Sequence, residues 1–165
     1  MMLGLSLHAV TILHVVISLI AIVSGLVALF GLFKSQSMPG MTAIFLLTTI
    51  LTNATGFMFP FEKLLPSHII AILSLVLLAI ACLALYGMKL SGAWRAIYLI
   101  TAIASLYLNV FVLVIQSFLK IGPLHALAPS VPPSEPPFAV VQGIVLGVAI
   151  LLDRVRASYF GRSRR

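Results

Sequence analysis

The feature that most constrains this chain is a succession of long apolar runs with few or no charged residues. The first run, residues 5–33, has no charged side chain, and four more follow at 41–59, 68–88, 94–118 and 138–152. A helix of about 20 apolar residues matches the hydrocarbon thickness of a bilayer. Because backbone polar groups in lipid must be satisfied internally, such runs are helical. The sequence therefore predicts an all-α fold, a polytopic transmembrane helix bundle of about five spans.

The composition of the chain excludes a water-soluble globule. Of its 165 residues, 62% are hydrophobic and only 8% are charged, which is too little polar surface for a protein dissolved in water. The runs fill most of the chain, so residues 1–165 are predicted to form a single integral membrane domain. The lone Cys82 excludes an internal disulfide and a cysteine metal cluster. The first 13 residues lack the basic segment of a signal peptide, so we expect the first run to persist in the mature protein.

The last third of the chain differs from the rest. Residues 121–137 contain six prolines, which predicts an extended outer loop without regular helix. The fifth run, 138–152, covers only about 22 Å as a helix, against a hydrocarbon core of about 30 Å. Arg154 and Arg156 could reach the interface and lengthen it, and a helix that lies at the surface is the alternative. Residues 153–165 are predicted to be a basic cytoplasmic tail.

Basic residues decide the predicted orientation. With five spans, the N-terminus outside and the C-terminus in the cytoplasm, only Lys63 and Lys120 lie outside, as the positive-inside rule favours. The cytoplasmic set is Lys34, Lys89, Arg95, Arg154, Arg156, Arg162, Arg164 and Arg165. Much of the net charge of +7 therefore follows a hydrophobic run and indicates orientation, not binding to nucleic acid. A four-span chain with both ends inside loses this alternation and ranks second.

In this orientation the polar residues gather in the outer half of the bundle. Asn53, Asn109, Gln116 and Gln142 are predicted to line a polar pocket that opens outward, with Glu62 and Glu135 near its rim. The alternative is that these side chains only join helices by hydrogen bonds.

All four histidines, His8, His14, His68 and His125, also fall on the outer side. We predict that His14 and His68 approach each other at the outer mouth, where they could bind haem or a metal. Interfacial histidines that only contact water and headgroups are the alternative. Small residues are predicted to form helix packing seams, at Gly25 in the first span and at Gly143 and Gly147 in the fifth.

Three stretches resemble a known kind of protein. They are residues 48–61 (TTILTNATGFMFPF) followed by Pro66-Ser67-His68, residues 107–116 (YLNVFVLVIQ), and the corner at 135–138. Together they cover about a third of the chain and resemble a family of small bacterial multi-pass inner-membrane proteins whose domain has no known function. The resemblance implies a bacterial inner (plasma) membrane location and no particular activity.

Three functions remain open. The first is a protein that binds a small ligand, haem or a metal, with His14 and His68 as candidate cofactor ligands. The second is a transporter component, which fits poorly because the spans contain no acidic residue. The third is a non-catalytic accessory or scaffold subunit whose partners are the lipid bilayer and another membrane protein. No phosphate-binding loop, nucleophile elbow or zinc-protease signature occurs, so we predict no catalytic residue.

Overall fold

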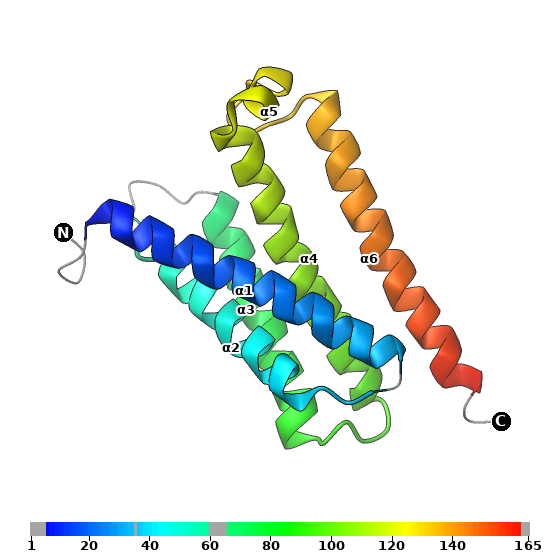
Figure 1. Cartoon of the computed structure of the whole chain (residues 1–165). Helices are drawn as coiled ribbons and strands as arrows, with labels where there is room; N and C mark the ends of the chain where they lie inside the picture. The colour runs from blue at the N-terminus through cyan, green and yellow to red at the C-terminus, as the bar shows by residue number, and fades with distance from the viewer. Residues whose placement is uncertain (1–5, 35, 60–65, 163–165) are drawn as a thin grey trace. The chain divides into compact units, whose positions relative to one another are not determined.

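The structure is a computed structural model that describes residues 6–34, 36–59 and 66–162 (Figure 1). These residues contain helices and turns but no strand, which confirms the predicted all-α class. The helices are α1 (Leu7–Phe33), α2 (Pro39–Gly56), α3 (Pro66–Cys82), α4 (Trp94–Lys120), α5 (Gly122–Leu127) and α6 (Pro136–Arg162), and the π-helical turn η1 (Leu83–Gly87) continues α3.

Within the part of the chain that the structure describes, three helical stretches are long and apolar enough to cross a bilayer, namely Leu7–Gly31, His68–Gly87 and Trp94–Lys120. Large apolar side chains on them point outward, with Phe30 65% exposed and Ile69 61% exposed. In lipid these side chains lie in their preferred solvent, so the chain is a transmembrane helical protein. α2 has 18 residues, and the apolar part of α6, Pro136–Leu152, is shorter still. That these two helices also cross stays a prediction.

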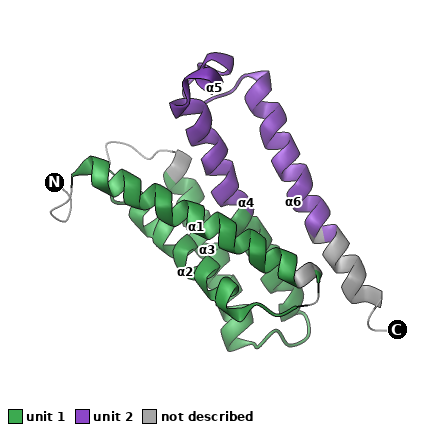
Figure 2. Cartoon of the chain, viewed as in Figure 1, with its two compact units in different colours: residues 1–106 green, residues 107–165 purple. Residues whose placement is uncertain are grey.

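Residues 1–106 and 107–165 form two compact units, here called unit 1 and unit 2 (Figure 2). In unit 1, α1 and α2 run antiparallel, because Gly25 lies against Phe45 at one end and His14 lies beside Gly56 at the other. α2 and α3 are also antiparallel, because Asn53 meets Ser74 whereas Phe57, just past the end of α2, meets His68 in the first turn of α3. The core of this unit is closely packed, with Ala21 and Thr49 fully buried.

Unit 2 is a helical hairpin made of the last part of α4, the short α5 and α6. Phe118 on α4 meets Phe138 on α6 edge to face, with ring centroids 5.6 Å apart. Further along, the Gln142 amide donates to the Phe111 carbonyl at 3.0 Å. These two contacts set α4 and α6 antiparallel within the unit.

The structure corrects one sequence expectation in this hairpin and adds detail to another. The proline-rich segment is not devoid of helix, because α5 occupies Gly122–Leu127; Pro123 stands in its first turn, where a helix does not need the missing N–H. The predicted tail begins as helix, because α6 continues through residues 153–162 to Arg162. Arginine and alanine are good helix formers, so the loss of hydrophobicity after Leu152 does not end the helix.

Candidate functional site

The C-terminal end of α2 meets a histidine from α1. His14 Nδ1 lies 2.8 Å from the Thr55 hydroxyl oxygen, which itself donates to the Leu51 carbonyl at 2.8 Å. When the single Thr55 hydroxyl proton goes to the Leu51 carbonyl, the Thr55 oxygen accepts the N–H of His14 Nδ1. In that tautomer the lone pair of a neutral His14 ring is on Nε2. The ring also meets Phe59 edge on, with centroids 5.4 Å apart.

The same end of α2 meets a second histidine, from the first turn of α3. His68 is only 5% exposed, and its ring stacks on Phe57 with centroids 5.7 Å apart and planes 28° from parallel. Residues 55–59 therefore contact both candidate ligands, His14 through Thr55 and Phe59 and His68 through Phe57. The direct approach of the two histidine rings stays a prediction.

The four residues of the predicted polar pocket are distributed over both units. Asn53, in unit 1, is buried; its amide donates to the Ser74 hydroxyl at 3.1 Å and to the Thr49 carbonyl at 2.8 Å. The other three belong to unit 2, where Gln142 is buried, Asn109 is half-buried and Gln116 is exposed. Asn53 and Gln142 each join two helices of their own unit. A pocket shared by all four stays a prediction.

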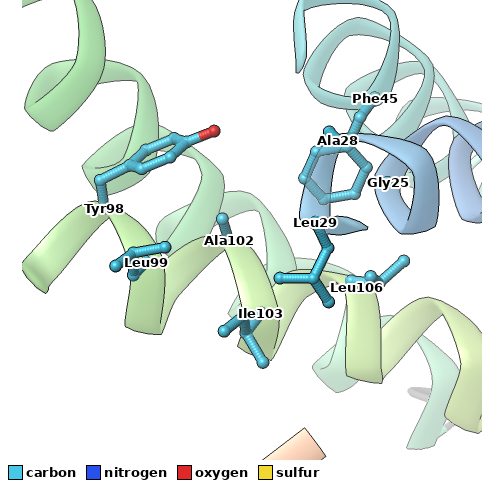
Figure 3. Close-up of a pocket in the computed structure, with 9 residues that line it drawn as sticks. All are labelled: Gly25, Ala28, Leu29, Phe45, Tyr98, Leu99, Ala102, Ile103 and Leu106. Atoms are coloured by element: carbon cyan, nitrogen blue, oxygen red, sulfur yellow. The ribbon is translucent and has the colours of Figure 1, made fainter. Parts of the chain in front are cut away.

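A small crevice lies between α1, α2 and α4 in unit 1 (Figure 3). Its volume is about 20 Å³, close to the minimum that holds one water molecule. The lining is apolar apart from Tyr98, whose side chain hydrogen-bonds that of Thr42. The lining residues are Gly25, Ala28, Leu29, Phe45, Tyr98, Leu99, Ala102, Ile103 and Leu106. The crevice is too small for haem or a comparable ligand.

Glu135, which is predicted at the rim of the pocket, lies in a loop whose polar groups hydrogen-bond to one another. Glu135 Oε1 accepts the Ser130 N–H at 2.9 Å, and Oε2 accepts the Ser130 hydroxyl at 2.9 Å and the Ser134 N–H at 3.0 Å. Loss of hydration raises the pKa of the Glu135 carboxyl, but these hydrogen bonds outweigh it and lower the pKa below its ordinary value. Glu62, the other predicted rim residue, lies outside the described residues.

His8 and His125 do not join His14 and His68 in a metal-ligating group within the described residues. His8 is exposed in the first turn of α1, and His125 on α5 is half-buried, with its Nδ1 buried and without a hydrogen-bond partner. Across residues 6–34, 36–59 and 66–162, no group of three or more His, Cys, Asp or Glu is placed to hold a metal ion.

Sequence reasoning missed the partners that position the predicted residues. Thr55 orients His14, and Ser74 receives Asn53. To predict either partner, one would need to know how the antiparallel helices are aligned along each other. The periodicity of a single helix carries no such information.

No family model matches the chain, and no curated protein or solved structure is significantly similar to it. The resemblance to bacterial inner-membrane proteins stays a prediction.

Proposed function

We propose that this chain is a non-catalytic accessory or scaffold subunit of a membrane complex, and that a helix of another membrane protein packs on α6. The observation that carries the proposal is the open face of α6, defined here as Val140, Gly143, Ile144, Gly147, Val148 and Leu151. A Cβ atom added at either glycine would meet nothing within 4 Å.

The open face lies on the opposite side of α6 from α4. Phe138 and Gln142 contact α4, and at about 100° per residue the two glycines lie between about 100° and about 180° around the helix from these two side chains. Val140, Ile144 and Val148 beside the glycines are between 51% and 61% exposed. Because one helix cannot cover both sides of another, α4 leaves this face available.

The chemistry of the open face favours a helix as its partner. Two glycines four residues apart let a second backbone approach closely, so that van der Waals contacts and weak Cα–H hydrogen bonds form. A β-branched residue follows each glycine, and such side chains have one preferred rotamer in a helix. They lose little entropy on packing, which distinguishes this face from an ordinary lipid-facing surface of leucine.

The polar groups support a structural role as well. Asn53 and Gln142 donate their amide hydrogens to neighbouring helices, and the crevice in unit 1 has the volume of about one water molecule. Neither feature offers a substrate a place to react.

The test is the mass of the tagged chain in mild detergent extracts of membranes, measured on native gels. The double variant Gly143→Leu/Gly147→Leu should lose a complex that the unaltered chain retains. Gly40→Leu is the matched control, because a Cβ at Gly40 also meets nothing within 4 Å but lies on α2. Equal helix content by circular dichroism shows that both variants fold. A complex that survives the double variant refutes the proposal, and one that the purified chain forms alone makes the partner a second copy.

A second candidate function is the binding of a metal or haem at the end of α2. The Thr55 hydroxyl orients His14 in the way that a hydrogen-bond acceptor commonly orients a metal-ligating histidine, and His68 contacts the same five-residue segment through Phe57. Absorption spectra and metal analysis of the purified protein test this candidate. A Soret band or a bound metal that is lost in both His14→Ala and His68→Ala supports it. An empty protein with neither signal refutes it.

We also propose that the chain lies in a bacterial inner membrane with its N-terminus outside and its C-terminus in the cytoplasm. The supporting observation is the distribution of basic residues in the sequence. Fusions of alkaline phosphatase, which is active only outside the cytoplasm, give the test. A fusion after Ser130 should be active and a fusion after Arg165 inactive; the reverse pattern would invert the orientation.

A further inference from the structure

The connection between α4 and α6 is unusually apolar for a segment between two helices. Residues 121–134 contain no Asp, Glu, Lys or Arg. Three of their large apolar side chains are strongly exposed, Val131 at 76%, Leu127 at 56% and Ile121 at 49%. Connections that project into water normally present polar side chains, so this surface requires another explanation.

Several polar groups of the connection find partners within the connection, although the buried His125 Nδ1 has none in the described structure. The backbone N–H groups of His125 and Ala128 donate to carbonyls of residues 121, 124 and 125. At the other end, the Glu135 carboxylate accepts both the N–H and the hydroxyl of Ser130 and the N–H of Ser134. A segment that provides its own hydrogen-bond partners enters the edge of a bilayer at a lower cost than one that depends on water.

The connection also precedes the end of α6 at which the helix can be extended by further apolar residues. The apolar part of α6, Pro136–Leu152, covers about 25 Å at the helical rise, which is about 5 Å less than a typical hydrocarbon core. At the far end, added length depends on the Arg154 side chain reaching the interface, whereas residues 121–134 can add apolar length without any charged side chain. α4 reaches the same level as the start of α6, because Phe118 meets Phe138.

We propose that residues 121–134 form a membrane-interface anchor in which Ile121, Leu127 and Val131 insert into the leaflet where α4 and α6 end. The partner is the lipid bilayer itself, and its contact continues the lipid-facing surface of the two helices. The anchor extends the apolar zone of α6 and fixes the depth of the hairpin. This inference does not depend on the partner proposed for the open face of α6.

Spin labels at single cysteines test the depth of the anchor. The label is placed by Val131→Cys or Leu127→Cys in a Cys82→Ser background, with the full chain in vesicles of phosphatidylethanolamine and phosphatidylglycerol. Oxygen concentrates in the hydrocarbon, whereas a water-soluble nickel chelate stays outside. We expect the ratio of oxygen to nickel accessibility to be several-fold higher at both positions than at the matched control Ser91→Cys, which is exposed in the turn between η1 and α4.

Two outcomes overturn the proposal. Nickel accessibility equal to that of the Ser91 control places the connection in water. Low accessibility to both reagents means that protein, not lipid, covers Leu127 and Val131. Using two label positions separates a local effect of one substitution from the depth of the whole segment.

Discussion

Gly25 in unit 1 is a point of close contact, whereas Gly143 and Gly147 in unit 2 meet nothing. A Cβ atom on Gly25 would lie 2.7 Å from the ring of Phe45 and 2.9 Å from Leu106. The sequence presents all three as small residues in apolar helices. A small residue therefore permits close helix packing only where a large side chain from a neighbouring helix fills the space beside it. In unit 2 the hairpin itself supplies no such neighbour for Gly143 and Gly147.

The largest effect should come from enlarging the glycine that is already in contact. Gly25→Leu forces Phe45 or Leu106 to move, and overpacking of this kind costs about 1–3 kcal/mol. Gly147→Leu in the purified chain should change the free energy of unfolding by much less, because its side chain enters open space. Unfolding in mixed micelles with increasing dodecyl sulfate measures both variants. Equal losses of stability in the two variants would show that Gly25 and Gly147 are packed equally tightly, which contradicts the difference between the two units.

A smaller effect is expected where unit 1 is joined by a side-chain hydrogen bond. Asn53→Ala removes the amide that donates to Ser74 on α3, and the coupling in a double-mutant cycle with Ser74→Ala should be about 0.6 kcal/mol, with about 1.7 as an upper bound for such bonds in membranes. The same unfolding assay measures the four proteins of the cycle. Strict additivity would mean that the bond between α2 and α3 contributes nothing.

Still less change is expected at the corresponding link in unit 2. Gln142→Leu loses the bond to the Phe111 carbonyl, but it also removes the buried Gln142 Oε1, which has no hydrogen-bond partner in the described structure. Because an unsatisfied buried acceptor is itself destabilising, the two effects oppose each other and the net change should be close to zero. A loss as large as that of Asn53→Ala would indicate that Oε1 is satisfied by a group outside the hairpin.

The helices could be predicted from the sequence because lipid imposes a simple rule: an uninterrupted apolar run must be helical. That rule places the runs at 41–59 and 94–118 close to α2 and α4. It fails where polar residues keep a helix going, as α6 does beyond Leu152, and where a proline occupies a first turn, as Pro123 does in α5.

The candidate site could be predicted only in part. Periodicity places Asn53 and His14 on particular faces of their helices, but the partners that fix them belong to other helices. Thr55 lies 41 residues from His14 and Ser74 lies 21 residues from Asn53. Such pairs depend on the relative register of two helices, which is set by packing and has no signature within either helix.

The smallest effect should be a local response of unit 2 to pH. The Glu135 carboxylate accepts hydrogen bonds from Ser130 and Ser134, which lower its pKa. A lowered pKa means that the ordered loop favours the ionised form, so its contribution is present above the ordinary carboxyl pKa of about 4.3 and disappears as the pH falls through the lowered value. The amide resonances of Ser130 and Ser134 should therefore shift together in that acidic range, and Glu135→Gln should abolish the shift. Because unit 1 has no corresponding carboxylate contact in its described part, the Asn53 amide resonances are the control. Their movement over the same pH range would show a global change and would contradict a response confined to the loop.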